Sequence, residues 1–198
     1  GGTFNEQQGT VEFTSDGTIQ NSETFYNLTK TTGGTTTLGA AITVSNTFTL
    51  SAGTFDVDVT NDYQISVGRD WNHSGGTFNE RQGIVEFITA GTPSQVLGAT
   101  TFYNFTSTAA GKQISFDAGE TQTVTNALTL TGASGSELVL RSTGTSPWLL
   151  DIDGAGTVDV DYVDVQYGDI DGTTVVTPTN GAINSGYNDV FDSSLTVA

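Results

Sequence analysis

The chain carries nearly the same thirteen residues twice. GGTFNEQQGTVEF begins at residue 1 and GGTFNERQGIVEF begins at residue 75, and only two of the thirteen positions differ. The likeness continues downstream, where ETFYNLT at 23–29 returns as TTFYNFT at 100–106. A sequence period of this length is typical of folds that stack one structural unit on the next.

The spacing between the two copies also indicates where turns lie. Gly1 matches Gly75, but Thr43 matches Thr123, where TVSNTFTL returns loosely as TVTNALTL, so the distance between matching positions grows along the chain. Insertions between matching segments belong in turns, because a turn absorbs extra residues and a strand does not. We therefore expect a first solenoid repeat unit over 1–74, a second over 75–145, and closing coils with a C-terminal cap or junction over 146–198.

Within each unit, apolar and polar residues alternate in short runs. Phe55, Val57 and Val59 are separated by two aspartates, and 158–165 alternates in the same way. A period of two predicts strands with one buried face. Gly, Asn, Asp and Ser punctuate the runs, and no stretch has helical periodicity. The chain is therefore predicted to be all-β.

Short strands combined with internal repetition favour a solenoid over other all-β folds. We predict a right-handed parallel β-helix with coils of about 20–26 residues, which gives roughly eight or nine short coils. A β-sandwich or a barrel of this length is the alternative. In the solenoid, repeated apolar residues should point inward and stack on their copies at equivalent coil positions. These residues are Phe4, Val11, Phe13, Phe25, Phe78, Val85, Phe87 and Phe102.

The charge balance excludes several classes of partner. The chain has 22 Asp and Glu but 5 Lys and Arg, for a formal net charge of -17. Nucleic acids and anionic membrane surfaces are bound through Lys and Arg, so neither is an expected partner. There is no apolar run of membrane-spanning length, so no membrane insertion is expected. The chain contains no Cys, which excludes disulfides and thiolate zinc sites, and no Met, from which we expect a processed chain or a piece of a larger one.

The string GGTFNEQQGTVEFTSDGTIQNSETFYNLT resembles the repeat units of very large bacterial surface proteins. The segment 148–169 followed by NSGYNDVF at 184–191 is similar to the segment that closes their arrays. The resemblance covers about residues 1–191. It implies an extracellular, secreted or cell-surface β-helical stalk that is adhesin-like or filament-like, and it names no ligand.

Residues that usually carry out chemistry are few. His73 is the single histidine, and no G-x-S-x-G, P-loop or zinc motif occurs. Sugar hydrolysis needs two carboxylates that face each other across a cleft, and this sequence carries no motif that would place them so. We therefore expect the protein not to be an enzyme.

Calcium is the best candidate for a bound ion, and no other cofactor is expected. The motif DIDG occurs at 151–154 and again at 169–172, with two carboxylates two residues apart and a glycine for a tight turn. Calcium binds six to eight oxygen ligands, and loops of this kind supply several. Neither copy matches the full EF-hand pattern. The candidate ligands are Asp151, Asp153, Asp169 and Asp171.

These observations favour a non-enzymatic extracellular structural module, a β-solenoid segment of a surface stalk, adhesin or self-assembling filament. Its expected partners are copies of itself or flanking solenoid domains, joined end to end. The alternative is a carbohydrate-binding or adhesive β-helix with a specific glycan site. For that alternative, Trp71 and Tyr103 are the candidate glycan contacts, because aromatic rings are preferred at binding surfaces.

Overall fold

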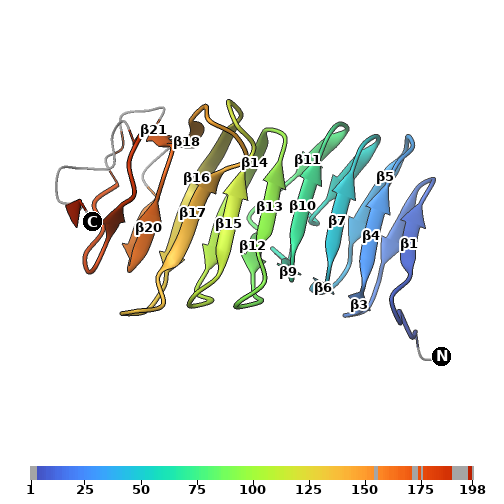
Figure 1. Ribbon diagram of the computed structural model, residues 1–198. Coiled ribbons are helices and arrows are strands. Elements are labelled where there is room, and N and C mark those ends of the chain that lie inside the picture. The colour runs from blue at the N-terminus through green and yellow to red at the C-terminus, as the bar shows by residue number, and fades with distance from the viewer. Residues whose placement is uncertain (1–3, 154–155, 171–173, 175, 189–195, 198) are drawn as a thin grey trace.

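The computed structural model describes residues 4–153, 156–170, 174, 176–188 and 196–197, and the side chains of all of these except the last two. The described chain contains strands and turns but no helix, and therefore no helix that could cross a membrane. All pairings between named strands are parallel, and the strands form three sheets. Figure 1 shows the turns stacked side by side along one axis, with the two termini at opposite ends. The predicted parallel β-helix is confirmed.

The three sheets are the faces of the solenoid. Sheet A contains β1 (Thr10–Phe13), β4 (Asn27–Lys30), β7 (Thr47–Leu50), β10 (Asp70–His73), β13 (Ser94–Leu97), β15 (Gln113–Phe116), β17 (Leu138–Ser142), β20 (Val163–Val165), β22 (Ile183–Asn184) and β23 (Thr196–Val197). Sheet B contains β2 (Gly17–Ile19), β5 (Thr35–Leu38), β8 (Thr54–Asp56) and β11 (Thr77–Asn79). Sheet C contains β3 (Thr24–Phe25), β6 (Ile42–Val44), β9 (Gln64–Val67), β12 (Ile84–Phe87), β14 (Thr100–Ser107), β16 (Thr121–Thr131), β18 (Trp148–Ile152), β19 (Thr157–Asp161) and β21 (Gly168–Ile170).

The described chain makes about seven turns, slightly fewer than the eight or nine expected. Each of the first four turns supplies one short strand to each sheet. In the fifth and sixth turns, β14 and β16 are longer and follow the corner between two faces. The first half of β14 continues the line of sheet B, because its Phe102 packs against Phe78 of β11. Its second half pairs with β12 in sheet C.

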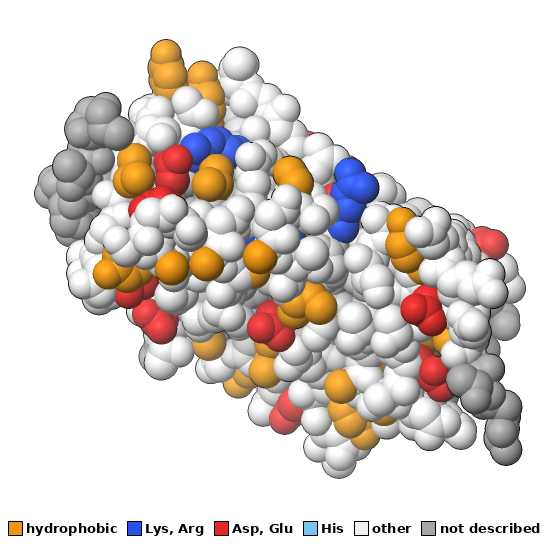
Figure 2. All heavy atoms as spheres, turned by 60° about the horizontal axis from the view of Figure 1, so that its bottom comes forward, with side chains coloured by type: hydrophobic (Ala, Val, Ile, Leu, Met, Phe, Trp, Pro, Cys, Tyr) orange, Lys and Arg blue, Asp and Glu red, His pale blue; other side chains and the backbone are white. Residues whose placement is uncertain are grey.

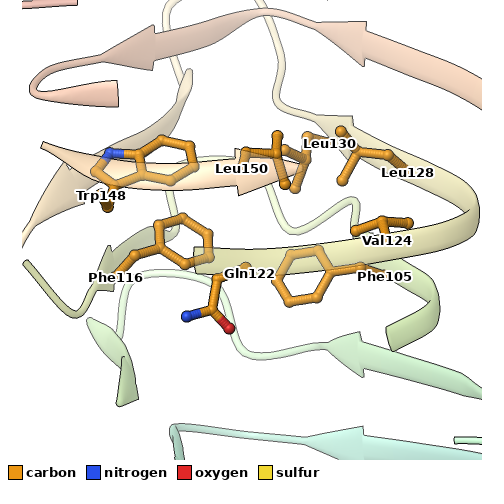
Figure 3. Close-up of a pocket in the computed structure, with 8 residues that line it drawn as sticks. All are labelled: Phe105, Phe116, Gln122, Val124, Leu128, Leu130, Trp148 and Leu150. Carbon is orange, nitrogen blue, oxygen red and sulfur yellow. The ribbon is translucent and has the colours of Figure 1, made fainter. Parts of the chain in front are cut away.

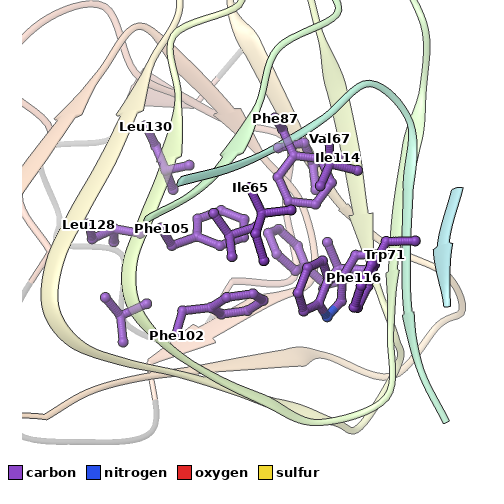
Figure 4. Close-up of a cluster of buried hydrophobic side chains, with 14 of the residues drawn as sticks. Ile65, Val67, Trp71, Phe87, Phe102, Phe105, Ile114, Phe116, Leu128 and Leu130 are labelled. Carbon is purple, nitrogen blue, oxygen red and sulfur yellow. The ribbon is translucent and has the colours of Figure 1, made fainter. Parts of the chain in front are cut away.

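The core lies inside the coil and is built by the alternation seen in the sequence. Inward side chains of consecutive turns stack on one another, and the aromatic ones form close ring contacts (Figure 4). The rings of Phe48 and Trp71 stack at 4.3 Å between centroids, as do those of Phe116 and Trp148. Stacked and edge-to-face pairs of this kind stabilise a core beyond the burial of their area.

Most of the repeated apolar residues point inward as expected. Phe25, Phe78, Val85, Phe87 and Phe102 are buried. The first turn differs, because its strands lie at the edge of the sheets. Val11 and Phe13 are there only partly buried against the core, and Phe4 is 42% exposed although its ring contacts that of Phe25.

The repeated residues do not stack on their copies, and this part of the prediction is wrong. Pairing along sheet A runs from Val11 through Leu28, Phe48 and Trp71 to Val96, so Trp71 lies three turns after Val11 and Val96 lies four turns after it. Val85, the copy of Val11, falls between these two positions in the sequence. The second copy is therefore displaced around the coil, and it contributes β12 of sheet C where the first copy contributes β1 of sheet A.

What the two copies share is the geometry of a corner and the strand that follows it. Gln7 and Arg81, at matching positions, both adopt a left-handed backbone, with φ of 46° and 50°. The asparagine of the FYN segment also behaves alike in both copies. The Asn27 side-chain oxygen accepts from Nδ2 of the asparagine one turn later at 2.8 Å, and so does that of Asn104 at 2.8 Å. The duplication thus encodes a local unit that fits more than one face.

Glycine is required where a corner packs closely against the preceding turn. Gly76 has φ of +79° and Gly98 has φ of +77°, in a region that side chains with a Cβ rarely adopt. A Cβ added at Gly98 would lie 2.1 Å from the His73 carbonyl oxygen. The spacing between turns is set by the backbone ladder, so neither corner has room to move away.

Candidate functional site

The interior of the coil is filled by side chains. An internal cavity of about 10 Å³ lies among apolar residues of the fifth to seventh turns, around Gln122 (Figure 3). Gln122 Nε2 donates to the Gly98 carbonyl at 2.9 Å, while its Oε1 has no partner in the structure. Such a space holds about one water molecule at most. It is too small for an organic ligand, so ligands of this region would bind on the outside.

Trp71 is not a surface residue, which corrects its assignment as a glycan contact. Its side chain is fully buried, stacked on Phe48, with Nε1 donating to Thr100 Oγ1 at 3.2 Å. The reason lies in the alternation of β10, where Asp70 and Asn72 face outward and Trp71 faces the core.

Tyr103, the other candidate glycan contact, lies in β14 and follows the buried Phe102. Alternation along the strand turns its side chain outward, and it is half-buried. Glycan contact by Tyr103 stays a prediction.

The DIDG segments are less loop-like than the sequence indicates. Asp151 lies within β18 and Asp169 within β21, because the apolar neighbours of each turn inward and place the aspartates on the outer surface. Asp153 follows β18 and is exposed, and Asp171 lies outside the described residues. Across the described part of the chain, no three acidic or histidine side chains converge as a metal site would require. Calcium binding stays a prediction.

His73 takes part in a hydrogen-bonded group beneath an outer hollow. Its Nδ1 lies 3.1 Å from Thr100 Oγ1, the hydroxyl that also accepts from Trp71. Burial lowers the pKa of His73, which favours the neutral ring, and the tautomer of that ring decides whether Nδ1 or the Thr100 hydroxyl is the donor. The hollow is lined by hydroxyl, backbone and apolar groups, and no carboxylate lines it among the described residues. A general acid and base pair is therefore not assembled here.

The arginines are held by neighbouring aspartates. Arg81 binds Asp56 through two contacts, Nε to Oδ1 at 2.9 Å and Nη2 to Oδ2 at 2.7 Å, and it lowers the pKa of Asp56. Arg81 replaces Gln7 of the first copy, so this ion pair belongs to the second copy. Arg141 also binds Asp164 through two contacts, here with its two terminal nitrogens, Nη1 to Oδ1 at 3.2 Å and Nη2 to Oδ2 at 2.6 Å. Arg69 is more exposed and lies 3.7 Å from the aspartate that follows it.

The two lysines are buried and bind backbone carbonyls. Lys30 Nζ donates to the carbonyls of Ser15 at 3.2 Å and Gly33 at 2.8 Å. The Lys112 ammonium donates to three carbonyls, those of Gly68 at 3.2 Å, Thr89 at 3.0 Å and Thr92 at 3.2 Å. Gly68, Thr89 and Lys112 follow the sheet C strands of three consecutive turns. Lys112 therefore joins three corners of the solenoid.

Lys112 predicts a specific pH dependence of stability. Burial lowers its pKa from 10.5 to about 8. Below about pH 8 the folded and the unfolded chain both carry the proton, and the cost of burying the ammonium is fully present. Between about pH 8 and 10.5 the unfolded chain binds more protons than the folded chain. The contribution of Lys112 to the free energy of unfolding therefore rises with pH in this range. Urea unfolding across this range should show that the difference in free energy of unfolding between the natural chain and Lys112→Met increases as pH rises. A constant difference would contradict the buried ammonium.

The outer surface of the coil is acidic but carries no single acidic patch on the face in Figure 2. Acidic side chains appear there at separate points, between hydrophobic side chains and a larger area of backbone and uncharged side chains. Threonines line up across neighbouring strands on the outside of sheet B, where Thr54 pairs with both Thr35 and Thr77. Because four of the five basic side chains are engaged by the fold and the fifth, Arg69, lies beside Asp70, the surface offers little that would attract an anionic ligand.

One corner was not singled out by the sequence analysis. Pro147, Tyr167 and Tyr187 are evenly spaced in the sequence. Trp148 N donates to the Tyr167 carbonyl at 2.9 Å, a hydrogen bond between neighbouring turns. The rings of Tyr167 and Tyr187 stack at 4.7 Å between centroids. These three residues carry rings, lie outside the strands and are spaced about one turn apart. That spacing would have revealed the group in the sequence if the length of a turn had been known.

Comparisons of the chain with protein-family models, with curated protein sequences and with solved structures found no match.

Proposed function

We propose that this chain is a non-enzymatic structural module of the cell exterior, a β-solenoid segment of a surface stalk, adhesin or self-assembling filament. The observation that carries the proposal is sheet A, whose parallel ladder runs without a break from β1 to β23. Each turn rests on its neighbours through backbone hydrogen bonds and stacked side chains. Such a stack makes a stiff, extended body, which is the property a stalk or filament needs.

The engaged basic residues and the filled core support a structural role. Lys30, Lys112, Arg81 and Arg141 hold corners and neighbouring strands together. The extracellular location is proposed from the resemblance of the GGTF and FYNL segments to bacterial surface repeats. The excess of acidic groups fits this setting, because like-charged bodies repel one another laterally while remaining soluble.

The partner we propose is another solenoid turn, from a second copy or from a flanking domain. β1, β2 and β3 lie at the ends of sheets A, B and C, and each is paired on one side within the described chain. Edge strands present free N–H and C=O groups that pair readily with another chain. Parallel pairing at all three edges at once would continue the coil. A contact between unlike ends does not close on itself, so repeated copies would form a filament.

End-to-end growth is tested by sedimentation velocity of the chain over a range of concentrations. The natural chain is expected to form elongated species whose size increases with concentration. Val11→Lys places a charge beside the apolar column at the edge and should keep the chain monomeric. Thr29→Lys adds the same charge on the outer side of β4 and should assemble like the natural chain. A monomer at every concentration would reject the self-assembling filament, and the stalk segment joined to flanking domains would be retained.

A further inference from the structure

The corner that follows sheet A in the last turns displays a column of rings. Pro147, Tyr167 and Tyr187 occupy this corner in successive turns, and the planes of the two tyrosine rings differ by 6°. Tyr187 is 73% exposed, which is high for a large hydrophobic side chain of the described residues. Thr145 and Asn188 join these three residues around a hollow that is open to solvent.

The backbone at both tyrosines is left-handed and is held by hydrogen bonds. Tyr167 and Tyr187 have φ of 55° and 60°, where Gly or Asn is the common choice. Tyr167 N donates to the Gly186 carbonyl at 3.2 Å, and Asn188 Oδ1 accepts from Gly168 N at 2.8 Å. Asn188 Nδ2 in turn donates to a carbonyl of β20 at 2.8 Å. The backbone that carries the rings is therefore held before any ligand arrives, and the two rings stack on each other, which lowers the entropy lost on binding.

The charge around the column restricts what it binds. Asp169 lies in β21 directly after this corner, and the net charge of the chain is -17. Asp164, in the preceding strand, is already bound by Arg141 and by the Ser185 hydroxyl. No lysine or arginine lines the hollow among the described residues. An anionic ligand would be repelled here, and a neutral one would not.

We propose that the ring column of Pro147, Tyr167 and Tyr187 binds a neutral oligosaccharide. One face of a hexose ring carries C–H groups with partial positive charge, which pack on the negative face of an aromatic ring. The sugar hydroxyls then remain at the rim, where the Thr145 hydroxyl is exposed beside the rings. The Tyr187 ring stacks on Tyr167 through one face, so its outer face gives one sugar of the chain a packing surface, and neighbouring sugars can extend over the hollow beside Thr145 and Asn188. The proposal goes beyond the structural role and does not depend on it.

A proline-rich peptide is the competing occupant, because such peptides also bind aromatic surfaces. Their prolines insert into grooves between separate aromatic side chains. Here the two tyrosine rings stack directly on each other at 4.7 Å, so no slot remains between them. Tyr167 covers only one face of the Tyr187 ring, and Tyr187 is 73% exposed, so its other face is open to a single sugar ring with polar groups beside it.

Binding is tested by titrating the whole 198-residue chain with neutral hexasaccharides of glucose, xylose, mannose or N-acetylglucosamine, using calorimetry and saturation-transfer NMR. At least one is expected to bind, and an oligogalacturonate of the same length is expected not to. Tyr187→Asn removes the ring while keeping a residue that accepts the left-handed backbone, and it should weaken binding about tenfold or more. Tyr187→Phe keeps the ring and should retain binding.

Tyr26→Asn is the matched control, because it removes a half-buried tyrosine that lies between β3 and β4, away from the column, and should leave the affinity unchanged. The proposal is overturned if none of the four neutral hexasaccharides binds, or if binding is the same in Tyr187→Asn as in the natural chain. It is also overturned if Tyr103→Asn abolishes binding, which would place the glycan on β14. A polyproline peptide that binds through Tyr187 while the sugars do not would assign the column to peptides instead. Circular dichroism of each variant establishes that the fold is kept.

Discussion

Replacing Trp71 with Ala is expected to lower the free energy of unfolding by about 3–5 kcal/mol. The indole is fully buried, stacked on Phe48 at 4.3 Å, and in edge contact with Phe78 at 5.0 Å. It also tilts against Phe102 of the following turn at 5.5 Å. Its removal therefore leaves a cavity that touches the third, fourth and fifth turns and deprives Thr100 of a donor. Neighbouring turns are fixed by their ladders and collapse only partly into the space.

The measurement is urea unfolding followed by tryptophan fluorescence and far-UV circular dichroism, with Tyr103→Ala as the control. Tyr103 is a large aromatic residue of β14 that is half-buried, so its loss should cost clearly less than that of Trp71. Hydrogen exchange should show the largest loss of protection in β7, β10, β13 and the first half of β14, because solenoid turns couple mainly to their neighbours. Equal effects of the two substitutions would contradict the burial of Trp71.

Replacing Lys112 with Met is the second large effect, with an expected loss of about 2–4 kcal/mol at neutral pH. Met keeps much of the length of the apolar stem, so little packing is lost. It removes the ammonium that serves the carbonyls of Gly68, Thr89 and Thr92 together. Each carbonyl would then lack a donor close to the core, and the corners of three turns would lose their common partner. The same ammonium lies 5.9 Å from the centre of the Phe87 ring, and this contact is lost as well.

Arg69→Met is the matched control for charge. It removes one positive charge from the adjoining corner, but the Arg69 side chain is 54% exposed and lies 3.7 Å from Asp70. An exposed pair of this kind contributes little to stability, so a change below about 0.5 kcal/mol is expected. Thermal unfolding of both variants at low and high salt separates the loss of a positive charge from the loss of the hydrogen bonds to the three carbonyls. A Lys112→Met chain as stable as the natural one at neutral pH would show that solvent replaces the ammonium at these carbonyls.

The alternation and the turn residues were enough to predict strands and most of their inward residues, and the internal repetition favoured the parallel solenoid over a sandwich or a barrel. Phe55 and Val57 alternate with aspartates, and Phe87 follows Glu86. Only an extended chain places such alternate residues on one face, where the apolar ones are buried. The duplication indicated that one structural unit stacks on the next. It did not predict the number of residues in a turn, which is why the copies were expected on the same face. The length of each turn depends on how many residues its corners hold, and sequence similarity between distant segments does not report that.

The candidate site was harder to predict, because the contacts between turns are decided by the register of the whole coil. Asp70 and Asn72 flank Trp71, and this alternation places Trp71 on the buried face, where pairing with β7 and β13 holds it. Tyr167 and Tyr187 are distant in sequence and meet only because one turn separates them.

By itself, then, the sequence determined what each short segment is: a strand with one apolar side, a glycine corner, or a turn stabilised by asparagine. These properties are set by backbone sterics and by the chemistry of adjacent residues, which act over a few positions. The tertiary structure alone decided which segments lie over one another, and with them the ring partners of Trp71, the carbonyl partners of Lys112 and the exposed tyrosine column. Those contacts join residues about one turn or more apart, so their geometry follows from the pitch and corner lengths of the coil rather than from any local pattern.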